Sequence, residues 1–290
     1  MLTRILGIIL PVFSIIALGY LYGRQARPDM SAVNRINMNV LCPCLVFAAL
    51  ASKSFDLAAN SILIWCSIGI VVGSGLLAWP FVRLLRADVR TFLPPMMFNN
   101  CGNMGVPLSV LAFGDAGLSA MVMLFTISNL LHFTLGQYIV YHGANLRHVL
   151  RIPMIHATWF GFFFALAKLQ VPDWLMLGIK MVGDATIPLM LFSLGVRMLD
   201  VSLKDWKLGV VGGVVCPVTG LVMAAVLAPL LHLSSTQTGL LMLFGSLPPA
   251  VLNFMVAEQY NQEPAKVASI VLIGNLFSIV FVPLGLVLAL

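Results

Sequence analysis

Apolar stretches of about twenty residues follow one another along almost the whole chain, separated by short loops. An α-helix needs about 20 apolar residues to cross the hydrocarbon core of a bilayer, so each stretch has the length of one crossing. Only 9% of the 290 residues are Asp, Glu, Lys or Arg, whereas 60% are hydrophobic. Because a soluble domain carries about 25% charged residues, the pattern predicts an all-α integral membrane protein. It excludes soluble enzymes, disordered chains and nucleic-acid-binding proteins.

Hydropathy and helix-breaking residues predict ten spans. The expected ranges are 4–23, 34–51, 60–85, 91–113, 117–141, 150–169, 174–198, 206–231, 236–259 and 265–288.

An even number of spans places both termini on one side of the membrane. With the termini outside, twelve of the sixteen basic residues, including Arg147, Arg197 and Lys204, fall in cytoplasmic loops, and only four, among them Lys53, fall outside. Because cytoplasmic loops are enriched in Lys and Arg, we expect both termini to lie outside.

The chain carries a weak internal repeat at half its length. The matching segments are Asn39–Pro43 with Asp184–Pro188, and Ile127–Leu131 with Ile273–Phe277, at offsets of 145 and 146 residues. Five spans in each copy is an odd number, so the second copy enters the membrane from the opposite side. This predicts two inverted five-span repeats, residues 1–145 and 146–290, a construction used by many secondary transporters.

Spans four and nine are interrupted by polar and helix-breaking residues at corresponding places in the two repeats. Span four reads Phe98-Asn-Asn-Cys-Gly-Asn-Met-Gly-Val-Pro-Leu108, and span nine reads Gly245-Ser-Leu-Pro-Pro-Ala-Val-Leu-Asn-Phe254. Proline removes a backbone donor, and broken backbone at membrane depth survives only inside protein or along a wet cavity. A matched pair of broken spans points to a transporter binding site near the midplane. Half-helix N-termini there suit a carboxylate.

The candidate substrate-binding residues are the polar and helix-breaking residues of these two segments. They are Asn100, Gly102, Asn103, Gly105, Pro107, Pro248, Pro249 and Asn253. Asparagine amides offer hydrogen-bond donors without the charge of Lys or Arg, although such side chains also hold helices together. The five cysteines lie in apolar stretches and form no metal-type motif, so we expect neither a metal site nor a cofactor.

Both interrupted segments resemble signatures of the auxin efflux carrier family. Asn100–Leu108 is similar to its span-four signature, and Leu247–Pro264 is similar to its span-nine segment. The resemblance covers essentially the whole chain and implies a fold related to the bile acid/sodium symporters. Spans one, two, six and seven would form a scaffold, and spans three to five and eight to ten a transport domain in which spans four and nine cross. It also implies elevator-type transport of small organic anions such as malonate or malate, and homodimerisation.

The chain departs from the plant members of that family in two places. They carry a proline where this chain has Asn253, so Pro248 and Pro249 are expected to supply the second break. They also carry a long hydrophilic loop after span five, which is only about a dozen residues here, Tyr141–Arg151. The resemblance is therefore to a compact bacterial member of the cytoplasmic membrane, and auxin is not the expected substrate.

Ionisable and amide groups at membrane depth are the candidates for coupling or for support of the site. Asp184 either carries a coupling proton or pairs with Lys180 one turn earlier. Glu258 closes span nine, and His132 follows Asn129 in span five; either is a candidate proton relay. Asn129 and its repeat counterpart Asn275 flank the broken spans. We expect coupling to protons, with sodium as the alternative because broken backbone and amide oxygens also bind Na⁺.

Two other classes of membrane protein remain as alternatives. A channel needs a lined pore or a ring of identical elements, whereas an inverted repeat favours alternating access. An intramembrane hydrolase needs paired aspartates, and the chain has the pairs Gly114-Asp115 and Gly183-Asp184. Neither pair has the additional glycine of the G-x-G-D form, and no H-E-x-x-H zinc helix occurs. A secondary carrier is therefore the favoured interpretation.

Overall fold

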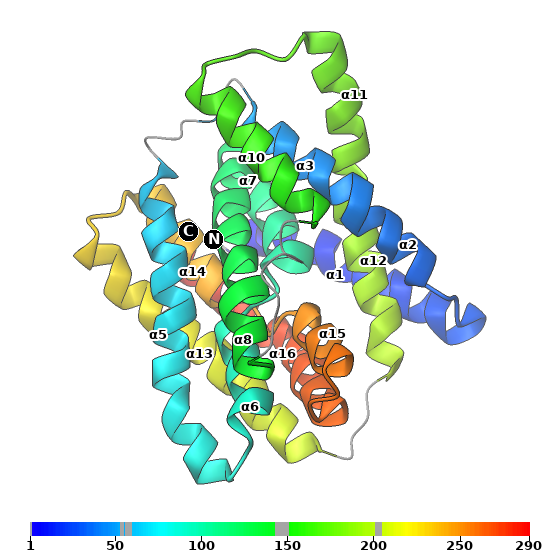
Figure 1. Ribbon diagram of the computed structural model, residues 1–290, viewed down its shortest axis with the longest axis vertical. Coiled ribbons are helices and arrows are strands. Elements are labelled where there is room, and N and C mark those ends of the chain that lie inside the picture. Colours follow the sequence, from blue (N-terminus) through cyan, green and yellow to red (C-terminus); the bar gives the residue numbers. More distant parts are fainter. Residues whose placement is uncertain (1, 53–54, 56–59, 143–150, 201–204) are drawn as a thin grey trace.

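The computed structural model describes residues 2–52, 55, 60–142, 151–200 and 205–290, and these residues are helical throughout apart from short turns. The elements are α1 (Leu2–Ala26), α2 (Ser31–Ile36), η1 (Asn37–Leu41), α3 (Cys42–Leu50), α5 (Ile62–Leu85), α6 (Val89–Met97), η2 (Cys101–Gly105), α7 (Val106–Leu131), η3 (His132–Gly136), α8 (Gln137–Val140), α10 (Pro153–Leu166), α11 (Asp173–Asp184), α12 (Thr186–Arg197), η4 (Met198–Asp200), α13 (Trp206–Leu230), α14 (Ser235–Gly245), α15 (Val251–Gln259) and α16 (Pro264–Ala289). Figure 1 shows their arrangement. The all-helical prediction is confirmed.

Seven stretches of the described chain, rather than ten, are long and apolar enough to cross a membrane. They are Thr3–Ala26, Ser31–Leu50, Ile62–Leu85, Cys101–Val140, Asp173–Arg197, Trp206–Leu230 and Pro264–Ala289. The breaks in spans four and nine leave α6, α14 and α15 with only 9, 11 and 9 residues, and α10 has 14. Helices nevertheless occupy each of the ten expected ranges, so the ten-span topology stays a prediction.

The 40-residue stretch Cys101–Val140 is bent where the turn between spans four and five was expected. Gly114 has φ +65° and ψ −151°, which is not a helical conformation. Residues with a Cβ rarely adopt a positive φ, so glycine permits this bend at little cost. The stretch therefore consists of two helical segments that meet at Gly114.

Local sequence explains where several helices begin. Proline is the first residue of α10 and of α16, where its missing N–H would have no partner anyway. The Ser234 side chain accepts from the Gln237 N–H while the Gln237 side chain accepts from the Ser234 N–H, a capping box that starts α14. The Asp88 carboxylate accepts from the Arg90 N–H and caps α6.

The helices pack into two groups. In one group α1 packs against α12, and α3 packs against α10 and α11. In the other, α13 packs against α5, α14 and α16, and α5 also contacts α6 and α7. The two groups meet where α7 contacts α1, α3 and α10, and where η2 contacts α12 (Figure 1).

Glycines bring α1 and α12 into backbone contact. A Cβ on Gly195 would run into the backbone carbonyl oxygen of Ile16, and a Cβ on Gly19 would run into that of Phe192. Small residues that allow such close approach are typical of helix pairs packed within a membrane.

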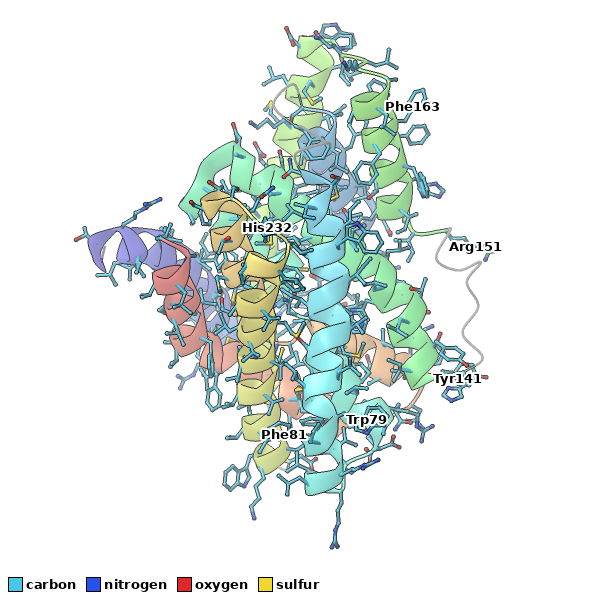
Figure 2. The ribbon with its side chains drawn as sticks, turned by 90° about the vertical axis from the view of Figure 1, so that its left-hand side faces the viewer. Trp79, Phe81, Tyr141, Arg151, Phe163 and His232 are labelled. Atoms are coloured by element: carbon cyan, nitrogen blue, oxygen red, sulfur yellow. The ribbon has the colours of Figure 1, made fainter. Side chains whose placement is uncertain are left out.

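The outer faces of the first group carry large apolar side chains. Trp159, Phe163 and Trp174 are exposed, Trp174 to 75%. Figure 2 shows Phe163 on the outer side of α10, directed away from the other helices. An exposed apolar surface of this extent is expected where a protein faces lipid. Lys53, Arg147, Lys204 and most of the loop Tyr141–Arg151 lie outside the described residues, and the orientation of the termini stays a prediction.

Candidate functional site

Spans four and nine break opposite each other and touch through extended backbone. Helix α6 ends at Met97 and α14 ends at Gly245, and Asn99 and Pro249 form an isolated antiparallel bridge between the two breaks. The Ala250 N–H donates to the Phe98 carbonyl at 2.9 Å, and the Asn100 N–H donates to the Pro248 carbonyl at 2.7 Å. Broken backbone groups thereby satisfy each other, as they must at membrane depth. We call residues 98–100 and 248–250 the crossover.

Four buried asparagines hold the crossover together. The Asn99 amide donates to the Phe244 carbonyl at 2.6 Å, and the Asn253 amide donates to the carbonyls of Phe98 and Ala250 at 2.9 and 3.0 Å. The other two, Asn100 and Asn275, are bonded to each other through their side chains. Because carbonyl oxygens only accept, these bonds fix the amide nitrogens of Asn99 and Asn253, and their Oδ1 atoms remain as acceptors.

The pair consists of Asn100 and Asn275. The Asn100 amide donates to Asn275 Oδ1 at 2.8 Å. The Asn275 amide in turn donates to the carbonyls of Pro249 and Val271 at 3.0 and 2.7 Å. Helix α16 thus orients the Asn100 side chain through one residue, which also contacts the crossover itself.

A cavity of about 100 Å³ lies beside the crossover, between the two helix groups. We call it the crossover cavity. Its lining residues are Asn34, Asn37, Met38, Asn99, Asn100, Cys101, Gly102, Asn103, Phe125, Asn129, Met190, Ser193, Leu194, Arg197, Ala250, Val251, Leu252 and Met255. Six of these are asparagines and one, Arg197, is a cation. The lining thus combines amide donors and acceptors with a positive charge, which is chemistry suited to a small carboxylate.

Several polar atoms of this lining have no partner within the described part of the chain. They are the Oδ1 atoms of Asn37 and Asn99 and the hydroxyl of Ser193, all buried. A buried polar atom without a hydrogen bond is unfavourable by about 1–3 kcal/mol. These atoms are therefore available to a bound ligand or to water.

A second cavity, of about 320 Å³, shares residues Arg197 and Val251 with the crossover cavity. Its other lining residues are Phe254, Glu258, Ala268, Val271 and Leu272. We call it the adjoining cavity. Arg197, the last residue of α12, therefore faces both spaces.

A third cavity, of about 500 Å³, lies between α3, α10, α11 and α7 and includes Asp115, Lys168, Asp173, Lys180 and Asp184. We call it the far cavity, since it shares no lining residue with the other two. Asp184 and Lys180 both line it, as the helical spacing of four residues allows.

The structure brings part of the predicted substrate site together. Asn100, Gly102 and Asn103 line the crossover cavity. The other five candidates, Gly105, Pro107, Pro248, Pro249 and Asn253, are buried outside that lining. Pro248, Pro249 and Asn253 instead take part in the crossover hydrogen bonds. Their contact with substrate stays a prediction.

The candidates for coupling or support are distributed over several places. Asn129 lines the crossover cavity and Asn275 orients Asn100. Glu258 lines the adjoining cavity and Asp184 the far cavity. His132 is buried and stacks on Phe98, with ring centroids 4.2 Å apart, and its Nε2 has no hydrogen-bond partner among the described residues.

Sequence reasoning missed five polar lining residues: Asn34, Asn37, Asn99, Ser193 and Arg197. Asn99 lies within the span-four segment and was overlooked beside Asn100. Arg197 was interpreted only as a basic loop residue that sets orientation. Asn34 precedes a π-helical turn in span two and Asn37 is the first residue of that turn, and π-helical turns often mark functional sites.

A polar bridge outside the crossover joins the start of α6 to the start of α16. The Thr91 hydroxyl donates to the Glu263 carboxylate at 2.6 Å. The Gln262 amide donates to the Asp88 carboxylate at 3.1 Å and to the Thr91 hydroxyl at 3.2 Å. These contacts tie the start of the broken span four to the start of span ten.

Both carboxyl groups of this bridge favour the ionised form. Hydrogen bonding from Arg90 is the main cause that lowers the pKa of Asp88, with Gln262 adding to it. Hydrogen bonding from Lys266, and then from Thr91, lowers the pKa of Glu263. The bridge therefore depends on deprotonated carboxylates.

The residues that the structure describes contain no group of three or more His, Cys, Asp or Glu side chains arranged to hold a metal ion. All five cysteines are free thiols.

Several known proteins are similar to this chain over almost its whole length. The sequence model of the family described as "Membrane transport protein" matches residues 4–147 and 138–286. An uncharacterized transporter from Methanocaldococcus jannaschii is 20% identical, with 96% of this chain and 97% of the relative covered. A protein of Rhizobium meliloti named "Putative malonate transporter" is 24% identical, with 96% and 93% covered. An uncharacterized transporter from Methanothermobacter thermautotrophicus is 26% identical, with 95% of each chain covered.

Proposed function

Because the chain belongs to the Membrane transport protein family, whose model matches it from residue 4 to residue 286, we propose that it is a secondary active transporter of small organic anions. The match confirms the family resemblance carried by Asn100–Leu108 and Leu247–Pro264. The family and the relatives are transporters, so the chain is a multi-pass membrane transporter and not an enzyme. This excludes the intramembrane hydrolase.

The crossover cavity is the observation that carries the proposed substrate class. Six asparagines and Arg197 line a space of about 100 Å³, well below the roughly 300–1,000 Å³ of pockets that hold drug-sized ligands. Amide N–H groups and a guanidinium recognise carboxylates through charge-assisted hydrogen bonds. The substrate is therefore a compact mono- or dicarboxylate of the malonate or malate kind, and the name of the Rhizobium meliloti relative supports malonate as the first candidate.

Transport follows an elevator-type alternating-access mechanism between two inverted five-span repeats. The support is the matched breaks of α6/η2 and α14/α15, and the packing of the helices into two groups with the cavity between them. The group containing α1, α3, α10, α11 and α12 acts as the scaffold. The crossover and the helices around it carry the substrate. The protein lies in the cytoplasmic membrane with both termini outside and forms a homodimer.

Transport is coupled to protons. Sodium is the alternative coupling ion, and one observation favours it. The buried amide oxygens of Asn37 and Asn99 have no partner among the described residues, and amide oxygens are suitable ligands for a hard cation such as Na⁺. Uptake in the presence of a pH gradient or a sodium gradient separates the two.

Uptake of radiolabelled malonate into proteoliposomes tests the proposal. We expect saturable uptake and accelerated exchange against internal malonate, and Asn100→Ala should reduce uptake at limiting malonate at least tenfold. Gln259→Ala, which removes an exposed amide on α15, is the matched control and should transport normally. Flux without counterflow, accompanied by single-channel currents, would establish a channel instead.

A further inference from the structure

The charge inventory of the crossover cavity limits the charge of its ligand. Among its lining residues Arg197 alone carries a formal charge, and Cys101 contributes a thiol. The lining therefore supplies one positive charge at most. Burying a charge without a compensating partner is strongly unfavourable. A doubly ionised dicarboxylate in this cavity would keep at least one negative charge uncompensated, and always one more than a singly charged anion would keep.

The hydrogen-bonding capacity of the lining gives an independent indication. Asn99 Oδ1 is locked as an acceptor, because the Asn99 amide nitrogen donates to the Phe244 carbonyl. It is buried and has no partner within the described chain, as is true of Asn37 Oδ1. A dianion offers only acceptors, so it leaves such oxygens unsatisfied. A carboxylic acid offers one O–H donor and satisfies one of them.

From these two observations, and resting on the proposed function, we infer that the transporter binds a dicarboxylate as its monoanion, with one carboxyl group protonated. The ionised carboxylate faces Arg197 and the amide donors. The protonated carboxyl donates its O–H to an amide oxygen of Asn99 or Asn37. The coupling proton thus crosses the membrane on the substrate, and one proton is released when the dicarboxylate ionises again on the far side.

Other titratable groups near the crossover lie outside this lining. His132 stacks on Phe98 on the η3 side, and Glu258 of α15 lines the adjoining cavity with Arg197. Arg35 is exposed on α2. A proton held by one of these side chains would make binding depend on the pKa of the protein and not on that of the ligand, which gives the inference a sharp test.

The test compares three ligands by calorimetric titration of the full-length protein in detergent between about pH 5 and pH 8. Malonate has a second carboxyl that titrates in this range. Difluoromalonate has a lower second pKa, because fluorine withdraws electrons. Malonamate, the half-amide, keeps one charge throughout and retains an N–H donor at the second position.

We expect the dissociation constant of malonate to rise about tenfold per pH unit above the second pKa of malonate, because only the monoanion is competent. The same rise should begin at lower pH for difluoromalonate, and the dissociation constant of malonamate should stay constant. In proteoliposomes, one proton should enter with each malonate.

Three outcomes overturn the inference. One is malonate binding that does not depend on pH. Another is a pH inflection at the same position for malonate and difluoromalonate, which would assign the proton to a side chain. The third is a parallel pH dependence for malonamate. Absence of binding by every small carboxylate would instead refute the proposed function, and the inference would fail with it.

Discussion

The hydrogen bond between Asn100 and Asn275 gives a quantitative prediction about how the crossover cavity is built. Asn275 does not line the cavity, but it accepts from the Asn100 amide at 2.8 Å, and both side chains are buried. Replacing Asn275 by alanine should therefore weaken substrate binding indirectly, chiefly by releasing Asn100 from its orientation, and in part by freeing the Pro249 carbonyl that the Asn275 amide also holds. Asn275 is in this sense a positioning residue.

The expected magnitude follows from measured side-chain hydrogen bonds between membrane helices. These average about 0.6 kcal/mol and reach about 1.7 kcal/mol. Since about 1.4 kcal/mol corresponds to a factor of ten, Asn275→Ala should raise the dissociation constant of malonate roughly 3- to 16-fold. Asn100→Ala should raise it further, because the ligand contact itself is lost. In the double variant most of the effect of Asn275→Ala should disappear, because no Asn100 amide remains to be oriented and only the contact with the Pro249 carbonyl is lost.

Calorimetric titration of the wild type, both single variants and the double variant measures the coupling as a double-mutant cycle. Ser278→Ala is the matched control on α16, since the Ser278 hydroxyl donates only to the Asn275 carbonyl within the helix. It should leave the dissociation constant unchanged. Effects of the two asparagine substitutions that add within about 0.5 kcal/mol would show independent sites and would refute the positioning role of Asn275.

Three further predictions concern stability, pH and charge. Gly195→Ala should destabilise the protein by about 1–3 kcal/mol, because the new Cβ meets the backbone of α1. Gly178 has open space around it, so Gly178→Ala is the control and should leave the stability unchanged. Thermal unfolding in detergent compares the two variants. Hydrogen bonds from Lys266 and Thr91 lower the pKa of Glu263 in the folded state. The Glu263 carboxylate therefore stabilises the folded protein fully above its unfolded pKa of about 4.3, and this stabilisation is lost as pH falls through the folded pKa. The unfolding temperature should thus fall between about pH 5 and pH 3, and less so in Glu263→Gln; an identical fall would contradict the argument. Arg197→Gln should abolish malonate binding, and Arg197→Lys should weaken it by about tenfold or more, because Lys cannot form a bidentate pair with a carboxylate. Calorimetric titration measures both affinities. Full affinity of Arg197→Gln would show that Arg197 does not bind the substrate.

Sequence alone located the two breaks because helix-breaking chemistry is local. Pro248 and Pro249 lack backbone donors, and Asn-rich segments compete with helical hydrogen bonds, so the interruptions at residues 98–100 and 246–250 were predictable. The same chemistry could not separate a residue that faces a ligand from one that braces the break. Asn100 and Asn103 line the cavity, whereas Asn253 holds two carbonyls beside it.

The contribution of the first helix group was beyond sequence reasoning for a different reason. Asn37, Ser193 and Arg197 reach the crossover cavity only because α12 packs against both η1 and η2. Neither residue spacing nor hydropathy encodes that contact between distant segments. Span counting had a related weakness, since a broken span such as α14 with α15 falls below the length that a continuous crossing needs.

The account rests on the claim that a small carboxylate binds in the crossover cavity and not in the far cavity. Malonate titrations of Asn103→Ala and Lys168→Gln compare the two spaces directly, because each residue lines only one of them. A hydrogen bond to a charged group contributes about 1.5–3 kcal/mol, so Asn103→Ala should lose about tenfold or more in affinity while Lys168→Gln keeps that of the wild type. Loss of binding in Lys168→Gln, with full affinity in Asn103→Ala, would contradict the account.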